Sequence, residues 1–376
     1  MTLSNRFCQL LVWTALWLLA ACSAPPEPLP VLRLGYAPND HHGPLFVAAM
    51  NPGYFQEHGG IYLKEIRFRE EYELIAADRP LARVLVEAGV GGEEQIRRLS
   101  EDQFDISFGG VPAMLELIDR GRPVRILAPV MAEGAALVLP NDAPANDWEG
   151  FLAQVRSRQQ PLKIGYKSAV SVQNLIFEHA LHESGISFSK GPEDGSAQVS
   201  LVNLNGAKHL IPAMENGLID GFVVMQPFVA LAQVKGSGKQ VALLRDLPPE
   251  GHWHGYPCCA LAANAQFVQN RPELAEALTI LMLRAKRFIT THPEQSARQI
   301  AQWLDLPAAV EAHSLPTIDF SVDLNPAWHR GVDFWVQSMI QMGELSGKVR
   351  EASRAGRLEA LLYEQGLHDR AVRQAQ

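Results

Sequence analysis

Cysteine is scarce in this sequence, and the few cysteines are not spaced as a disulfide framework. The 376 residues include four cysteines, which are Cys8, Cys22 and the adjacent pair Cys258 and Cys259. Small exported domains that depend on disulfides carry many more cysteines for their length. A long chain can instead bury enough apolar surface to be stable without cross-links. We therefore expect a large fold that its core stabilises.

Excess positive charge is also missing. The chain has 33 Lys and Arg residues against 41 Asp and Glu residues, a net charge of −8. No overall basic field attracts phosphate backbones, so nucleic acid is not an expected partner. Hydrophobic residues at 47% and charged residues at 20% exclude a disordered chain. Since domains usually hold about 150 residues, the length favours two lobes.

The familiar catalytic motifs are absent too. The sequence contains no Gly-x-Ser-x-Gly elbow, no phosphate-binding Gly-x-x-x-x-Gly-Lys-Ser/Thr loop and no His-Glu-x-x-His helix. The cysteine pair does not have the Cys-x₂-Cys spacing of a structural zinc site. We therefore expect no enzymatic activity, no cofactor and no dedicated metal site.

No apolar run is long enough to span a membrane. The run Leu10 to Ala21 is shorter than the roughly 20 residues of a spanning helix and fits the core of a signal peptide. Its end, Leu19-Ala20-Ala21-Cys22, resembles the bacterial lipoprotein cleavage box. We expect residues 1–21 to be a signal peptide, Cys22 to carry lipid and the proline-rich residues 22–30 to be a tether. A plain secretory signal cut near Ala21 is the alternative.

The rest of the chain alternates strands with helices. Strands are expected at 31–36, 61–68, 104–108, 162–166, 199–203 and 221–225, and the chain from residue 271 on is expected to be mainly helical. The charged segment from Arg69 to Arg83 is expected to lie on the surface. This alternation is typical of α/β folds with mostly parallel sheets.

Candidate binding residues follow the strand ends, because ligands bind outside the carboxyl ends of parallel strands, near helix N-termini. Some of these residues have structural explanations as well: loop histidines can be exposed, glycines can serve a turn, and serines can cap a helix. We expect the ligand contacts to come from Asp40, His41, His42, Gly109, Gly110, Val111, Lys167, Ser168, Ser171, Gln226, His254 and Tyr256.

The segment from Gly251 to Cys259 holds two histidines, Trp253, Tyr256 and both remaining cysteines. Three interpretations stay open: buried structural thiols on a strand that crosses between lobes, a solute contact from His254 or Tyr256, and metal or redox chemistry. Histidine and cysteine are ligand types that soft metals prefer. A single metal ion would, however, need partners from elsewhere in the chain.

Several blocks, in this order, resemble a known family. They are Leu34-Gly35-Tyr36 with its proline loop, Phe104 to Gly110, Asn216 to Pro227 and Arg271 to Leu274. The chain resembles the extracytoplasmic solute-binding proteins of ABC importers, in the nitrate, sulfonate, taurine and thiamine-pyrimidine-precursor family. The likeness covers nearly all of the chain after Cys22.

The resemblance implies a type II periplasmic-binding-protein fold, an α/β fold with two lobes, mixed sheets and a central ligand cleft. Lobe 1 would comprise 31–134 with 260–376, and lobe 2 would comprise 135–259. The protein would be a lipid-anchored, extracytoplasmic monomer that captures a small solute and delivers it to the transmembrane permease. The solute would be an organic anion such as a sulfonate or taurine, nitrate, or a small heterocycle. The alternative is a metal-binding or thiamine-pyrimidine-synthase-like protein that uses residues 252–259.

Overall fold

The computed structural model describes residues 28–191 and 197–376. The expected signal peptide, the lipidation site Cys22 and most of the expected tether lie outside these residues. Contacts divide the chain into Met1–Pro30 and Val31–Gln376, and the second unit contains the fold described below. Within the described residues, no helix is both long and apolar enough to cross a bilayer.

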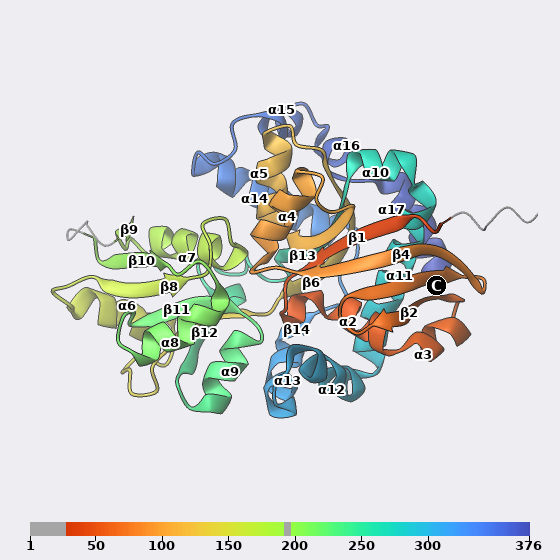
Figure 1. The fold of residues 1–376 in the computed structure, drawn as a ribbon. Helices are drawn as coiled ribbons and strands as arrows, with labels where there is room; N and C mark the ends of the chain where they lie inside the picture. Colours follow the sequence, from red (N-terminus) through yellow and green to blue (C-terminus); the bar gives the residue numbers. More distant parts are fainter. Residues whose placement is uncertain (1–27, 192–196) are drawn as a thin grey trace, which may run out of the picture. The chain divides into compact units, whose positions relative to one another are not determined.

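The first sheet has eight strands in the order β14-β6-β13-β5-β1-β4-β3-β2. Strand β1 pairs in parallel with β4 and β5, while β13 pairs antiparallel with β5 and β6. The sheet is therefore mixed, as expected. Figure 1 shows its early strands in red to orange and β13 in teal. The bounds are β1 Val31–Tyr36, β2 Ile61–Arg67, β3 Glu71–Ala76, β4 Arg79–Ala88, β5 Ile106–Gly110, β6 Val124–Glu133, β13 Pro257–Asn264 and β14 Ile318–Asp319.

One sequence prediction for this sheet was wrong. The segment from Arg69 to Arg83 is not a surface connection, because most of it forms the antiparallel strands β3 and β4. Its charged residues alternate with buried ones, among them Tyr72, Leu74 and Ala82. Alternation of this kind buries one face of a strand and leaves the other in water.

The second sheet has six strands in the order β12-β7-β11-β8-β10-β9. Strand β8 pairs in parallel with β10 and β11, and β7 pairs antiparallel with β11 and β12. The expected strands at 162–166, 199–203 and 221–225 are confirmed. The bounds are β7 Ala135–Leu139, β8 Leu162–Tyr166, β9 Phe188–Lys190, β10 Val199–Asn203, β11 Gly221–Met225 and β12 Lys239–Leu243.

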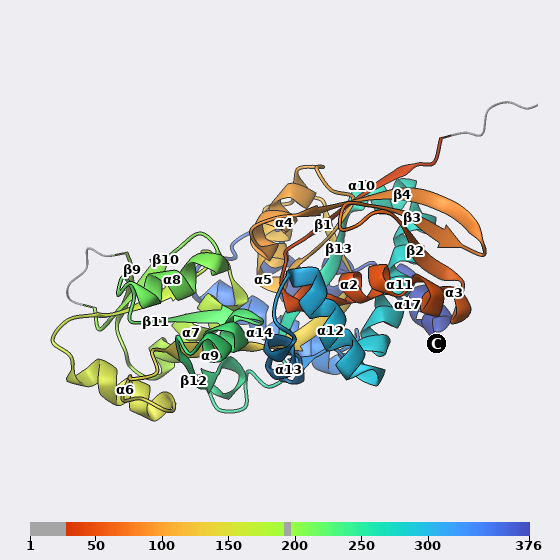
Figure 2. The same cartoon turned by 60° about the horizontal axis from the view of Figure 1, so that its bottom comes forward.

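Helices cover both sheets, and the last third of the chain is mainly helical, as expected. Figure 2 shows α12 beside α2 and α13. The α-helices are α2 Gly43–Met50, α3 Pro52–Glu57, α4 Gly92–Ser100, α5 Val111–Asp119, α6 Trp148–Ser157, α7 Val172–Glu183, α8 Leu210–Glu215, α9 Phe228–Lys235, α10 Ala265–Asn270, α11 Pro272–Thr291, α12 Pro293–Leu304, α13 Ala308–Ser314, α14 Pro326–Gln341, α15 Lys348–Arg354, α16 Leu358–Leu362 and α17 Gln365–Ala375. Short 3₁₀ turns are η1 Asp40–His42, η2 Ala207–His209, η3 Leu244–Asp246 and η4 Leu315–Thr317.

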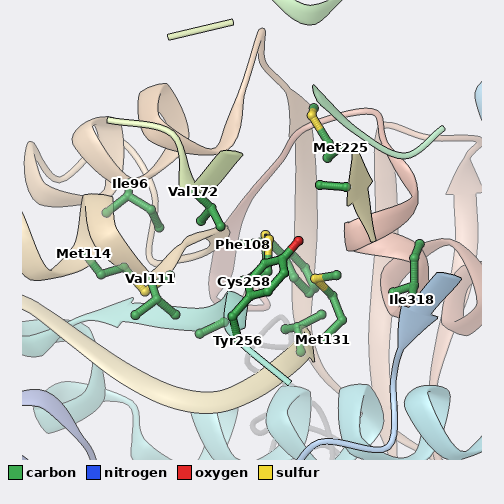
Figure 3. Packing of buried hydrophobic residues seen from close by; sticks show 14 of the residues in the cluster. Ile96, Phe108, Val111, Met114, Met131, Val172, Met225, Tyr256, Cys258 and Ile318 are labelled. Atoms are coloured by element: carbon green, nitrogen blue, oxygen red, sulfur yellow. The ribbon is translucent and has the colours of Figure 1, made fainter. Parts of the chain in front are cut away.

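Strand β13 lies in the middle of the first sheet and is buried along its whole length. It contains both cysteines of the described chain, and Figure 3 shows Cys258 in the buried cluster, close to Phe108 and Tyr256. Such a strand has neighbours on both edges and core on both faces. Its side chains are therefore placed by the packing around them.

Candidate ligand-binding site

The loop that leaves β1 folds into the turn η1, whose polar residues are buried. Asn39 caps the turn, because its side-chain oxygen accepts a hydrogen bond from the backbone N–H of His41 at 3.1 Å. His41 and His42 are each 1% exposed. Buried polar side chains need partners inside the protein, and the two imidazoles find different ones.

The His42 ring is fixed by contacts on its own side of the site. Its Nδ1 accepts a hydrogen bond from the backbone N–H of Ala37 at 2.8 Å. In the neutral ring the proton must therefore sit on Nε2. The ring stacks on Phe108, with centroids 5.1 Å apart. Burial lowers the pKa of His42, so the neutral form dominates at pH 7.

The His41 ring has the opposite proton arrangement. Its Nε2 lies 3.0 Å from the carbonyl oxygen of Gly134. Because a carbonyl oxygen can only accept, Nε2 carries the proton, and in the neutral ring the lone pair is on Nδ1. That Nδ1 lies 3.4 Å from Sγ of Cys258 and 3.8 Å from Sγ of Cys259.

A β-bulge brings both cysteines to the same imidazole. Pro257 pairs with Ala132 and Cys259 with Met131, so Cys258 has no partner residue on β6. Side chains normally alternate between the two faces of a strand, and a bulge redirects one of them. The two Sγ atoms are 4.0 Å apart, and both cysteines are free thiols.

The two thiols differ in acidity. Burial raises the pKa of Cys258 well above its ordinary value. Hydrogen bonds with Cys258 and His42 lower the pKa of Cys259 well below its ordinary value, against the opposing effect of burial. Cys259 therefore ionises before Cys258, because its sulfur accepts these hydrogen bonds.

Loops of the second sheet complete the site. Ser171 caps α7, with its Oγ accepting from the backbone N–H of Asn174 at 3.3 Å. Gln173 in the first turn of α7 has its amide nitrogen 3.8 Å from Sγ of Cys258. Burial lowers the pKa of Lys167, and the nearby cysteines oppose that shift. Glu93 of α4 accepts a hydrogen bond from the N–H of Val170 at 3.2 Å, which ties the two sides together.

These residues enclose a cavity of about 20 Å³, which holds about one water molecule. Residues from elements of both sheets line it, and several of them are polar. Its lining comprises Asn39, His41, His42, Gly92, Glu93, Gly110, Lys167, Ser168, Val170, Ser171, Val172, Gln173, Met225, Cys258 and Cys259.

The structure gathers half of the twelve expected binding residues at this cavity. The six that line it are His41, His42, Gly110, Lys167, Ser168 and Ser171. The other six have no place in its lining, and these are Asp40, Gly109, Val111, Gln226, His254 and Tyr256.

Asp40 and Gln226 have structural partners. Ser314 of α13 donates its hydroxyl to the Asp40 carboxylate, and burial raises the pKa of Asp40 to about 6. Gln226 donates to Thr317 at 3.1 Å and accepts from the N–H of Ala230 at 3.1 Å. Both side chains therefore connect the strand ends to neighbouring helices and turns.

Gly109 and Val111 serve packing. A Cβ on Gly109 would lie 2.2 Å from Cγ1 of Ile96, so the glycine allows α4 to approach β5. Val111 is fully buried in the core.

His254 and Tyr256 line a different depression, together with residues of α14. His254 is mostly exposed, and its Nε2 lies 3.5 Å from a carboxylate oxygen of Asp246. Tyr256 is buried, with its side chain in the cluster drawn in Figure 3. The segment 252–256 therefore lies apart from the cavity, and only the cysteines that follow it reach the site.

Sequence reasoning did not assign the cysteines, Asn39, Glu93 or Gln173 to the ligand site. The sequence contained one indication of such a site: the adjacent cysteines are ligand types that soft metals prefer, but one ion would need a further ligand from elsewhere in the chain. The structure places His41 beside them. Asn39, Glu93 and Gln173 reach the cavity because of how elements of the two sheets pack against each other. No local sequence pattern predicts that packing.

Comparison with known proteins gives two kinds of result. Residues 25–305 match the sequence profile of the NMT1-like family. A 112-residue stretch is 34% identical to the uncharacterized protein MJ1180 of Methanocaldococcus jannaschii and covers 30% of this chain and 77% of that protein.

Solved structures with a similar fold include periplasmic binding proteins and a component of an import system. The nitrate-binding protein NrtA of Synechocystis PCC 6803 has a TM-score of 0.69 at 15% identity, over 93% of this chain and 90% of that one. The ligand-binding component of an ABC-type import system of Staphylococcus aureus, solved with zinc bound, has a TM-score of 0.68 at 15% identity. The match covers 91% of this chain and 99% of that one. The periplasmic aliphatic sulphonate binding protein SsuA of Escherichia coli has a TM-score of 0.62 at 13% identity, over 91% of this chain and 100% of that one. These similarities confirm the expected periplasmic-binding-protein fold.

Proposed function

The chain belongs to the NMT1-like family, and from that premise we propose that it is the extracytoplasmic solute-binding component of an ABC importer. Its structural neighbours are binding proteins of transporters. That supports importer function over the alternative of an enzyme or a metal protein built on residues 252–259. The importer component would be anchored by lipid on Cys22, act as a monomer and dock on the transmembrane permease.

The observation that carries this proposal is the cavity, which is lined by loops of both sheets. Gly110 is the last residue of β5, and the loops after β1 and β8 supply His41 and Lys167. A ligand that touches both sets of loops holds the lobes together and favours the closed form. The permease would recognise that closed form.

We propose His41, His42, Gly110, Lys167, Ser168 and Ser171 as the solute contacts. The side chains of Asp40, Gln226 and Val111 would act indirectly, because they hold the loops in place. His254 and Tyr256 would contribute to a separate surface.

A thermal-shift screen on residues 23–376 tests this function. Nitrate, ethanesulfonate, taurine, small pyrimidines and divalent metals are each added to protein that has been stripped of bound ligands. A ligand that binds only the native state stabilises it by RT ln(1 + c/Kd), where c is the free ligand concentration, so the melting temperature rises with the logarithm of that concentration once it exceeds Kd. If the solute is an anion, the shift should vanish in Ser171→Ala combined with Lys167→Met. For any solute, it should persist in the control His254→Ala. If no member of a broad solute panel shifts the native protein, or if the control variant loses the shift, the proposal fails.

A further inference from the structure

We propose that His41, Cys258 and Cys259 bind one thiophilic metal ion at the wall of this cavity, and that this ion is the captured solute. The role as cargo rests on the proposed function, whereas the binding of the ion does not. Within the described residues, these side chains form a fully buried group of ligand atoms that all lie within 4.8 Å of one another. The ion would take thiolate and imidazole ligands, as Zn²⁺ and Cu⁺ do.

The distances between the three ligand atoms fit a single ion. The sides of the triangle are 3.4, 3.8 and 4.0 Å, and a circle through its corners has a radius of about 2.2 Å. Zinc bonds are about 2.3 Å to sulfur and about 2.0 to 2.1 Å to nitrogen. An ion close to the centre of this triangle would therefore reach all three atoms without a change of rotamer.

The hydrogen bonds around His41 are those of a metal ligand. The carbonyl of Gly134 holds the proton on Nε2 at 3.0 Å, which leaves the lone pair of Nδ1 directed at the sulfurs. Ligating histidines usually donate their other N–H to a carbonyl or carboxylate in this way. The bulge at Cys258 also favours a shared ligand, because without it the side chains of the adjacent cysteines would point to opposite faces of the strand.

Charge also favours an ion here. Two thiolates and one Zn²⁺ are neutral together, so the site avoids the cost of a net buried charge. For Cu⁺, the remaining negative charge would be balanced by Lys167, which lines the same cavity. Two bare thiols and an imidazole without an ion have only weak hydrogen bonds to offer one another.

Three protein ligands would leave one coordination position of a tetrahedral ion open toward the cavity. Three protein ligands with a free fourth position are typical of zinc sites that exchange a ligand. The volume of about 20 Å³ suits one water molecule on the ion. Buried Oε1 of Gln173 also lines this cavity and has no hydrogen-bond partner in the described part of the chain, so it could accept from that water.

The test uses residues 23–376, stripped with a chelator under reducing conditions and then titrated with Zn²⁺, with Cu⁺ or with Co²⁺ as a spectroscopic probe. We expect about one equivalent of Zn²⁺ by native mass spectrometry. Co²⁺ should give thiolate-to-metal charge-transfer absorption in the near ultraviolet and the visible bands of a tetrahedral ion. Cys258→Ser, Cys259→Ser and His41→Ala should each weaken binding by roughly 100-fold or more. The exposed-segment variant His252→Ala with His254→Ala is the matched control and should bind normally.

Circular dichroism of each metal-free variant shows whether that variant folds. The Co²⁺ spectrum of the unmutated protein tests the site even if a variant fails to fold. The proposal is overturned if that spectrum lacks thiolate bands, or if metal binding follows His252 and His254 instead. If ethanesulfonate or nitrate stabilises the metal-free protein and Zn²⁺ does not bind, the metal site is refuted and the solute-binding function stands. If Zn²⁺ binds the three residues but does not stabilise the closed form in small-angle scattering, the ion is not the cargo.

Discussion

His41 and Cys258 are 217 residues apart in the chain, yet Nδ1 of the histidine lies 3.4 Å from Sγ of the cysteine. The contact joins the loop after β1 to the central strand β13. Only β5 lies between β1 and β13 in the sheet, so the loop after β1 is near β13. The bulge then turns Cys258 toward that loop. The contact between His41 and Cys258 is therefore a product of sheet topology together with one irregular residue.

The reactivity of the cysteines tests this burial. A form of the protein that begins at Ser23 contains Cys258 and Cys259 as its two cysteines, and both are buried. We expect Ellman's reagent to modify them at least about 100-fold more slowly in native buffer than in 6 M guanidinium, because access requires opening. The absorbance of released thionitrobenzoate measures the rate. Complete reaction within seconds in native buffer would show that the thiols are exposed.

Two neighbouring glycines should respond differently to the same substitution. A Cβ on Gly109 would lie 2.2 Å from Ile96 and 2.8 Å from the carbonyl oxygen of Gly92, whereas the nearest atom to a Cβ on Gly110 is 3.5 Å away. Gly109→Ala should lower the free energy of unfolding by about 1 to 3 kcal/mol through overpacking. Gly110→Ala is the control and should change stability by less than about 0.5 kcal/mol. Urea unfolding measures both, and equal effects would contradict the packing described for α4.

Asp119 connects the end of α5 to the start of α15. Its carboxylate accepts backbone hydrogen bonds from Ser346, Gly347 and Val349 at 2.8 to 3.0 Å. Asp119→Ala leaves these donors unpaired in a mostly buried place, and should cost about 3 kcal/mol of unfolding free energy. Asp147→Ala, which removes the exposed cap of α6, should cost about 1 kcal/mol. A smaller loss at Asp119 than at Asp147 in urea unfolding would refute this role.

Lys286 should make stability depend on alkaline pH. Burial lowers its pKa from 10.5 to about 8, and its ammonium donates to the carbonyls of Pro129 and Val322. Between pH 8 and 10.5 the unfolded chain binds more protons at this residue than the folded chain, so the free energy of unfolding rises with pH across that window. Below pH 8 the penalty for the buried charge is fully present and constant. The rise attributable to Lys286 has an upper bound of about 3 kcal/mol.

The comparison is between unmutated protein, Lys286→Met and the exposed control Lys163→Met, in urea at pH 7, 8.5 and 10. The gain in unfolding free energy from pH 7 to pH 10 should be smaller in Lys286→Met than in the other two proteins. Parallel curves for all three would mean that Lys286 does not titrate in this range.

Regular patterns made much of the fold predictable. Strands 162–166, 199–203 and 221–225 are short apolar runs beside polar loops, and each occurs at its expected bounds. The loops after strands also gave six of the fifteen residues that line the cavity, because the carboxyl ends of parallel strands lie together. The pair β3 and β4 was missed because their charges were given more weight than the alternation of buried residues.

The cysteine cluster was beyond such reasoning. Regular alternation places Cys258 and Cys259 on opposite faces of a strand, and the bulge that reverses this depends on pairing with β6, far away in sequence. Its partner His41 was expected to contact the ligand, but no local pattern links it to the two cysteines. Tertiary pairing decides both positions, and a single sequence does not encode that pairing in any local pattern.

Anomalous X-ray diffraction is the most direct test of the central claim, that the cavity beside β13 is the ligand site. Crystals of residues 23–376 grown with Zn²⁺ would be measured on both sides of the zinc absorption edge. The proposed metal site predicts a peak about 2.0 to 2.3 Å from Nδ1 of His41 and from the two Sγ atoms of Cys258 and Cys259. A peak bound only to exposed residues such as His254, with the cysteine cluster empty, would contradict it.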